Sequence, residues 1–307
     1  SPAGPAASGN VLIGVKKKGA PASEGYLWSW HVWLTNYNPD AVAPSWQEDV
    51  YSYSVTGGAV HRYAGATWAT AAYTDKFIMD RNFGAASATR ADGLGKTRGL
   101  YYQFGRKDPF PAASVLLYDG TGVALPRYHA NADCISRISG TTALKTAVQH
   151  PYNFYYPESG DWVQSNPYSG NSWNNPGWYT SVPKAGKSLF DPCPPGWRLP
   201  VNGAWDTFVL LGTNTPNAAN YPGDYKYGQD QAGWEFYMSG SSGETAFYPA
   251  SGCRGDVMAN EWNTGYYWSS TPNSSTIGRF LDIRATIVYP QNYANRSLGF
   301  PGRCVQE

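Results

Sequence analysis

The stretch GRFLDIRATIVYPQNYANRSLGF at residues 278–300 decides the fold that the sequence predicts. Its first part alternates as a strand does, so Leu281 and Ile283 point to one face. This apolar face predicts a strand packed on a hydrophobic core. The opposite face carries an aromatic ring, an acid and a base, namely Phe280, Asp282 and Arg284. An aromatic side chain exposed beside charges is typical of a binding patch, so we predict that this face is turned outward.

The neighbouring residues extend this predicted patch. Residues 287–295 are rich in tyrosine and asparagine, the mixture that antibody-like binding loops use. We predict a ligand-binding face formed by Trp262, Asn263, Tyr266, Thr276, Ile277, Phe280, Asp282, Arg284, Ile287, Tyr289, Asn292 and Tyr293. The scaffold beneath it is predicted to comprise Tyr267, Trp268, Leu281, Ile283, Phe300 and Cys304. The alternative is that the whole stretch only completes the last strands of the fold.

The composition favours recognition by aromatic rings and excludes two classes of partner. Among 307 residues there are 13 Trp and 24 Tyr, which offer much contact area at low entropic cost. The net charge of +1 provides no electrostatic footprint for nucleic acid. No apolar segment approaches the ~20 residues that span a bilayer, so direct membrane insertion is not expected.

The residue patterns predict one α+β domain over residues 11–307, after a flexible tail or linker at residues 1–10. Residues 11–15 form an apolar run suited to a strand. Residues 26–35 alternate with tryptophan on both faces, which predicts a strand buried on both sides. Helices are predicted at residues 142–149, with Thr142 as the cap, and at residues 202–212, with Asn202 as the cap. Long ordered loops connect these elements.

Catalysis and metal binding have little support in the sequence. The four cysteines lie far apart, the four histidines have no ligand-like spacing, and no nucleophile or phosphate-loop motif occurs. His31, within a Trp-rich strand, is predicted to be packed rather than to bind a metal. The charges at residues 80–81 and 106–108 are predicted to form buried ion pairs or turn hydrogen bonds. We therefore expect no enzyme activity, no metal and no cofactor.

Six motifs, in a fixed order, resemble a known family: FIMDRNFGA (77–85), YYQFGRKDPF (101–110), AVQHPYNF (147–154), DPCPPGWRLP (191–200), GYYWSST (265–271) and GFPGRCVQE (299–307). Together they look like the Fibrobacter succinogenes major paralogous domain, found in fimbrillin-related surface proteins of Bacteroides-like bacteria. LWSWHVWLT (27–35) is similar to the opening strand of the same proteins. The resemblance covers nearly the whole chain from about residue 11 onward.

This resemblance implies a C-type-lectin-like fold, with short, mostly antiparallel strands and about two helices. In such folds a cysteine beside a Pro-x-Gly-Trp turn pairs with one near the C-terminus, which implies a Cys193–Cys304 disulfide. A bridge closing so long a loop would stabilise the fold by a few kcal/mol in an oxidising compartment. Cys134 and Cys253 lie outside the motif, and whether they pair is left open.

The resemblance also implies a location on the outside of the cell, as a secreted protein or at the outer-membrane surface. It suggests an adhesin-type domain, of a fimbrial pilus tip or another surface protein, that binds protein or glycan on another cell or host surface. The calcium-binding motifs of sugar-binding lectins are not complete here. One alternative is a structural assembly module that binds pilus subunits, for which residues 11–15 are the candidate exchanged strand. The other is an oxidase like formylglycine-generating enzyme, whose close cysteine pair the last hundred residues lack.

Lectin-fold proteins diversified by retroelements carry their variable residues near the C-terminus, before a Gly-Phe motif like Gly299-Phe300. The asparagines at positions 273, 292 and 295 look like retained template codons in such a region. The resemblance therefore also suggests a hypervariable region generated by a diversity-generating retroelement, which would include Thr276, Ile277, Phe280, Asp282, Ile287, Tyr289 and Tyr293.

Overall fold

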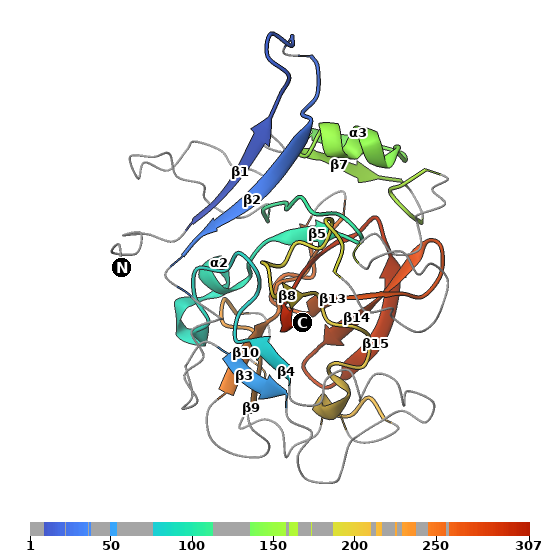
Figure 1. The fold of residues 1–307 in the computed structure, drawn as a ribbon. Coiled ribbons are helices and arrows are strands. Elements are labelled where there is room, and N and C mark those ends of the chain that lie inside the picture. Colours follow the sequence, from blue (N-terminus) through green and yellow to red (C-terminus); the bar gives the residue numbers. More distant parts are fainter. Residues whose placement is uncertain are drawn as a thin grey trace.

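The computed structural model describes residues 9–21, 23–35, 37, 50–53, 76–112, 136–157, 160–164, 173, 187–209, 213–216, 225, 229–237, 245–255 and 258–307. Residues 1–8 of the predicted tail and Cys134 lie outside these ranges, whereas Gly9 and Asn10, which were also assigned to the tail, belong to the first strand. Six small sheets, all antiparallel except the β6–β7 pair, make up most of the regular structure (Figure 1). With only two short α-helices among the described residues, the fold belongs to an α+β or mostly-β class.

The strands of the first half of the chain are β1 (Gly9–Val15), β2 (Trp28–Leu34), β3 (Val50–Tyr53), β4 (Lys76–Met79), β5 (Tyr101–Gln103), β6 (Ser136–Ser139) and β7 (Asn153–Tyr156). Those of the second half are β8 (Trp197–Arg198), β9 (Gly233–Tyr237), β10 (Thr245–Pro249), β11 (Cys253–Arg254), β12 (Met258–Ala259), β13 (Gly265–Pro272), β14 (Ile277–Ile283), β15 (Val288–Asn295), β16 (Gly299–Pro301) and β17 (Val305–Gln306). The C-terminal strands β16 and β17 pair with β5 and β4, so the chain end closes the middle of the molecule.

The helices are α2 (Leu94–Thr97) and α3 (Leu144–Gln149), with short 3-10 turns η1 (Arg90–Asp92) and η2 (Asp206–Phe208). Helix α3 confirms that a helix forms within residues 142–149, but the predicted cap Thr142 is wrong, because the helix begins at Leu144 with Ala143 at the N-cap. The helix predicted at residues 202–212 is wrong, because only the three-residue turn η2 forms in its described part. The expected cap Asn202 is engaged elsewhere: its N–H donates to Thr271 Oγ1 and its Nδ2 to Gln291 Oε1.

Strands β13 and β14 lie between two hydrophobic clusters. Tyr267 and Leu281 belong to one cluster with Trp205, whereas Trp268 belongs to the other with Phe300. Successive residues of a strand point to opposite faces, so each strand fills both clusters at once. All six residues predicted as scaffold are buried, which confirms that prediction.

The Cys193–Cys304 disulfide is present, with the two Cα atoms 5.9 Å apart and a sequence separation of 111. In the loop-entropy model a closed loop of this length stabilises the fold by about 4 to 5 kcal/mol. Cys253 is a free, buried thiol, and burial raises its pKa to about 11.

The charged motifs form the buried contacts that the sequence predicts. The Arg81 guanidinium lies 2.8 Å from the Asp80 carboxylate, and Lys107 Nζ lies 2.7 Å from Asp108. Arg106 donates to several backbone carbonyls, including those of Asn153 and Pro151 on the neighbouring segment. These contacts fix the loops that carry the charges.

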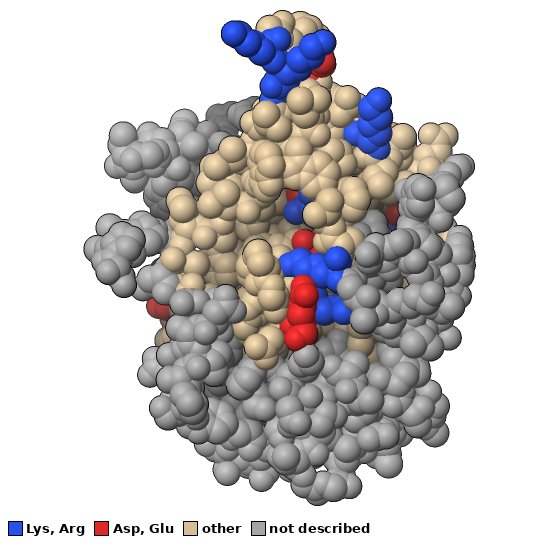
Figure 2. Space-filling view, viewed as in Figure 1, with Lys and Arg blue, Asp and Glu red and all other residues tan. Residues whose placement is uncertain are grey.

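The β1–β2 hairpin projects along one side of the molecule, next to α3 (Figure 1). The prediction that the second strand is buried on both sides is wrong, because Trp30 is 52% exposed opposite Ile13, itself 50% exposed. Lysines 16–18 lie at the tip of the hairpin, and Figure 2 shows a largely uncharged surface below this tip. Among the described residues, no helix is long and apolar enough to cross a membrane.

Candidate functional site

One end of the β13–β14–β15 sheet brings together several of the predicted ligand-binding residues. Asp282 lies directly opposite Tyr266 on β13 and Tyr289 on β15, and directly opposed residues share a face of the sheet. The Asp282 carboxylate accepts hydrogen bonds of 2.7 and 3.1 Å from the Arg284 guanidinium and one of 2.9 Å from Asn292 Nδ2. We call Tyr266, Arg284, Tyr289 and Asn292 the polar rim.

Two predicted contact residues lie beneath the rim rather than on it. Phe280 is buried against Trp268 and Phe300, with ring centroids 5.9 and 4.9 Å away, so its predicted exposure is wrong. Asp282 is fully buried as well, and its predicted outward position is also wrong. The alternation correctly indicated two faces, but the second face is covered by aromatic rings from other strands. Asp282 therefore positions the rim from below.

The rim is half-open to solvent and held in place. The Arg284 side chain is 49% exposed, and its guanidinium lies 5.8 Å from the centroid of the Tyr289 ring. Its hydrogen bonds to Asp282 raise the pKa of Arg284 above the ordinary value. The Arg284 N–H donates to the Ile287 carbonyl at 2.8 Å, which closes the β14–β15 turn and sets the partly buried Ile287 at the edge of the rim.

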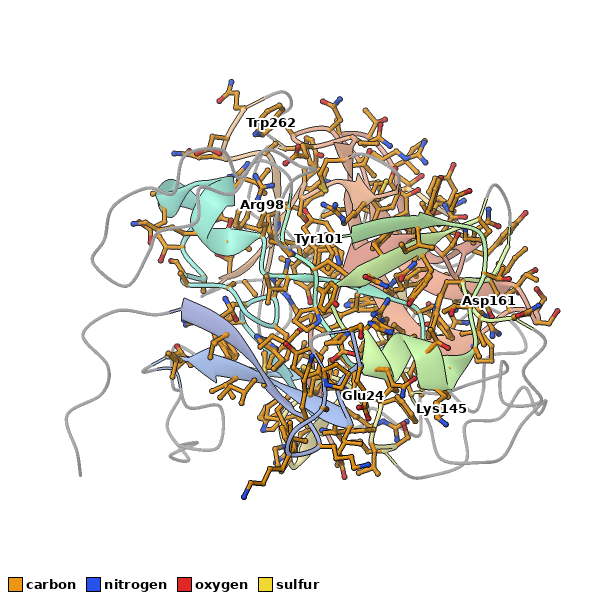
Figure 3. All side chains as sticks on the ribbon, turned by 90° about the horizontal axis from the view of Figure 1, so that it is seen from above. Glu24, Arg98, Tyr101, Lys145, Asp161 and Trp262 are labelled. Atoms are coloured by element: carbon orange, nitrogen blue, oxygen red, sulfur yellow. A yellow bond between two sulfur atoms is a disulfide. The ribbon has the colours of Figure 1, made fainter. Side chains whose placement is uncertain are left out.

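Trp262 and Asn263 lie on the turn that leads into β13. Asn260 Nδ2 donates to the Tyr266 hydroxyl at 2.9 Å and so ties this turn to the polar rim. Trp262 is 42% exposed and has a backbone φ of 64°, a conformation that a bulky residue rarely adopts. Its neighbour Glu261 pairs with Arg98, and Figure 3 shows Trp262 at the periphery of the molecule on the side of Arg98. Local strain at an exposed aromatic is typical of a functional position.

Three further predicted residues lie at the opposite end of the same sheet. Ile277 begins β14, Thr276 directly precedes it, and Tyr293 lies opposite Arg279 near the end of β15. Ile277 and Ile283 are six residues, ~20 Å, apart along β14. Tyr293 follows the rim residue Asn292 in the chain, but it lies opposite Arg279 and therefore on the other face of the sheet. The predicted face is therefore not one continuous site.

The chemistry of the rim suits recognition. A guanidinium, an amide and two phenolic rings offer hydrogen bonds and flat apolar surface, and burial of the ring raises the pKa of Tyr266. No group of three histidine, cysteine or acidic side chains within the described residues could hold a metal ion. Nearby, Gln291 Nε2 donates to both oxygens of Asp206, whose pKa burial raises to about 6.

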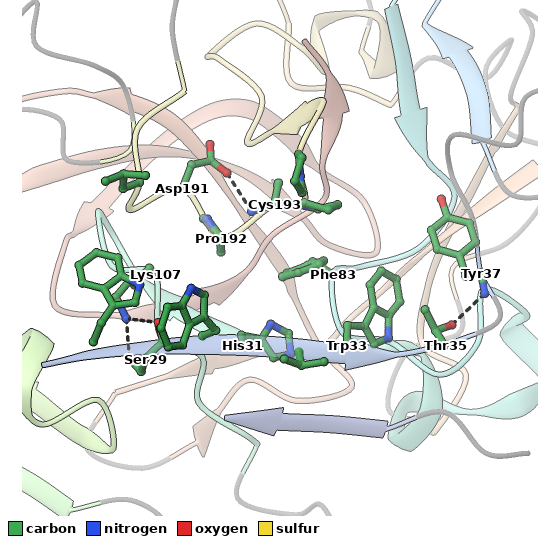
Figure 4. A pocket seen from close by; sticks show the side chains of 16 residues that line it. Ser29, His31, Trp33, Thr35, Tyr37, Phe83, Lys107, Asp191, Pro192 and Cys193 are labelled. Atoms are coloured by element: carbon green, nitrogen blue, oxygen red, sulfur yellow. Dashed lines mark hydrogen bonds between the residues drawn. The ribbon is translucent and has the colours of Figure 1, made fainter. Parts of the chain in front are cut away.

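The sequence did not predict a second candidate site, a groove of about 480 Å³ between β2 and residues 191–195 (Figure 4). Its lining includes His31, which the sequence placed in the packed core. His31 is partly buried. Its Nε2 is hydrogen-bonded to Asn10 Oδ1, and its Nδ1 to the Tyr102 hydroxyl. Burial lowers the pKa of His31 to about 4. The signal available in the sequence was the density of tryptophan on both faces of one short strand.

Comparison of the chain with models of known protein families, with curated proteins and with solved structures gives no match.

Proposed function

We propose that this protein is an extracellular, adhesin-type binding domain that contacts protein or glycan on another cell or host surface through the polar rim and Trp262. The proposal includes a C-type-lectin-like fold of the Fibrobacter succinogenes major paralogous type and export to the cell surface. The buried Cys193–Cys304 disulfide supports export, since such bridges persist in oxidising compartments. The bond also joins the Pro-x-Gly-Trp turn to the chain end, as the resemblance implies.

The observation that carries the proposal is the buried Asp282 carboxylate beneath the rim. It holds Arg284 and Asn292 in fixed positions beside Tyr289 before any ligand arrives. Binding surfaces gain affinity when side chains are ordered in advance, because less entropy is lost on association. Arginine and tyrosine are also the side chains most enriched at binding hot spots.

Burial reduces the number of positions that can vary in the proposed hypervariable region. Substitution of Phe280 or Asp282 would disturb the packed sheet, because both are buried. Tyr289, Tyr293 and Thr276 lie at least partly exposed, so different side chains fit there without repacking. A retroelement that diversified this protein would therefore act on the exposed positions and spare the two buried ones.

The test is a binding screen of the labelled protein on glycan arrays and on bacterial and host cells, with and without calcium. We expect saturable binding that does not need calcium and that Arg284→Ala weakens at least tenfold, since a central arginine is a typical hot spot. Lys17→Ala is the matched control, because it removes an exposed positive charge at the hairpin tip.

Equal losses in the two variants would show non-specific charge attraction and would contradict the proposal. Absence of saturable binding in every arm would also contradict it. Arg284→Ala leaves the buried Asp282 carboxylate with fewer hydrogen bonds and should lower thermal stability, so binding is measured at a temperature at which both variants are fully folded.

A further inference from the structure

The groove beside β2 follows the edge of the strand rather than one of its faces. A cavity above one face would contact alternate residues, because side chains alternate between faces. Six consecutive residues of the strand, 28–33, line the groove instead. Figure 4 shows β1 along the opposite edge of β2, with the groove on the other side.

No strand pairs with β2 along this edge in the part of the chain that the structure describes, and the only β2 backbone group there with a side-chain partner is the Ser29 carbonyl. Strand β2 pairs there with β1 alone. The carbonyl of Ser29 accepts a hydrogen bond of 3.0 Å from Lys107 Nζ, a residue of the groove wall, so Ser29 presents its backbone to the groove. Backbone groups alternate between the two edges of an antiparallel strand, so His31 and Trp33 present theirs in the same direction.

The floor of the groove is aromatic. The Phe83 ring meets His31 and Trp33 edge to face, with centroids 5.0 and 5.2 Å away. The indole Nε1 of Trp33 is buried without a hydrogen-bond partner among the described residues. The aromatic floor offers apolar area, and the open strand edge beside it offers backbone hydrogen bonds. A ligand that fills the groove can use both.

The opposite wall cannot pair with β2. It contains Pro192, Pro194 and Pro195, which have no backbone N–H to donate. The wall is also fixed, because Asp191 accepts hydrogen bonds of 2.9 Å from the backbone of Cys193 and of Leu199, and Cys193 is bonded to Cys304. The two sides of the groove are thus held apart with one edge left open.

Charge restricts the occupant. Lys107, the cation at one end of the groove, is paired with Asp108 at 2.7 Å. Asp191 is buried and engaged by backbone amides. The groove therefore offers no free charge to a ligand, which favours an uncharged segment.

We propose that this groove accepts an extended, uncharged segment of a partner polypeptide, which adds to β2 as a third strand and places apolar side chains on the Phe83–Trp33 floor. Such strand addition draws affinity from backbone hydrogen bonds and specificity from alternate side chains. The site is separate from the polar rim and does not depend on its function.

The probe is an acetylated and amidated peptide, TVTVTVTKKK, in which the alternating part forms the strand and the lysines keep it soluble. The matched control has the same side chains, but every amide of its alternating part is N-methylated. Fluorescence of the groove tryptophans reports binding. Backbone hydrogen exchange of the unmodified protein reports the state of the His31 and Trp33 amides.

We expect saturable binding of the probe, at least tenfold weaker binding of the N-methylated control, and fast exchange at His31 and Trp33 that slows when the probe is bound. Arg284→Ala should bind the probe as the wild-type protein does, which separates this site from the polar rim. Slow exchange at His31 and Trp33 before any peptide is added would show an edge that is already paired and would overturn the proposal. Equal binding of the two peptides, or binding of oligosaccharides but of neither peptide, would overturn it as well.

Discussion

The β1–β2 hairpin and the β13–β14–β15 sheet are both antiparallel and rich in apolar and aromatic residues, yet they have opposite roles in the packing. Both faces of β14 are buried, with Leu281 in one cluster and Phe280 in the other. The hairpin has one face that is only partly buried, and it leaves Ile13 and Trp30 half-exposed. The comparison teaches that alternation identifies a strand but not the number of layers that cover it. The sheet stabilises the molecule, whereas the hairpin offers surface.

The largest expected difference comes from the same substitution made in each region. Ile283→Ala on β14 should lower the free energy of unfolding by about 2 to 5 kcal/mol, because it leaves a cavity at a fully buried position. Ile13→Ala on β1 should lower it by about 1 kcal/mol or less, since half of that side chain is already exposed. Urea unfolding of the two variants measures both values. Similar losses would contradict the contrast between a buried sheet and an exposed hairpin.

A pair of glycines gives a smaller effect. A Cβ at position 278 on β14 would overlap the ring of Phe104, which is itself packed against Trp173 and Trp268. Gly278→Ala should therefore destabilise the protein by about 1 to 3 kcal/mol through overpacking. A Cβ at position 9 on β1 meets nothing within 4 Å, so Gly9→Ala should be close to neutral. Thermal unfolding distinguishes the two, and a destabilising Gly9→Ala would show closer packing of β1 than the structure has.

The smallest effect separates the regions by pH. Burial lowers the folded-state pKa of His31, on β2 of the hairpin, to about 4. Between pH 6.5 and pH 4 the unfolded chain therefore binds the proton and the folded protein does not, so the stability decreases as the pH is lowered. Burial raises the pKa of Asp206, beneath β15, to about 6, so between pH 6 and its ordinary pKa the folded state binds the proton and stability rises as pH falls.

Two variants resolve these opposite slopes. The free energy of unfolding of His31→Gln, taken relative to that of wild type, should increase on going from pH 7 to pH 5, because only wild type loses stability through His31. Asp206→Asn should change in the other direction, because wild type gains stability there and the variant does not. Denaturant unfolding at the two pH values measures both. Parallel slopes in the two variants would contradict the assigned pKa shifts.

Much of the sheet was predictable from the sequence, because local alternation reports one buried face directly. Leu281 and Ile283 follow that pattern and are buried. The exposure expected for Phe280 was wrong, because its cover includes Phe300, which folds back from a later strand. The helix expected at Asn202 was wrong for the same kind of reason, since its side chain bonds Gln291 on β15. Partners distant in sequence leave no local signal.

In the two candidate sites, too, some features were predictable from the sequence and others arise only from the fold. The polar rim was predictable in its composition, since Arg284, Tyr289 and Asn292 lie within one short stretch. Its support by the buried Asp282 was not, because burial depends on the layers above. The groove was beyond prediction, because it arises where β2 meets a proline-rich turn more than 150 residues later. Only the fold brings these two segments together.

The central claim is that binding resides in the polar rim and not in the whole C-terminal sheet. Two tyrosines on β15 provide the test: Tyr289 belongs to the rim, whereas Tyr293, four residues further along the strand, is exposed on the other face of the sheet. The dissociation constants of Tyr289→Ala and Tyr293→Ala are measured against the glycan or cell type that binds the wild-type protein in the screen. We expect a loss of tenfold or more for Tyr289→Ala and little change for Tyr293→Ala. Equal losses, or a larger loss for Tyr293→Ala, would contradict it.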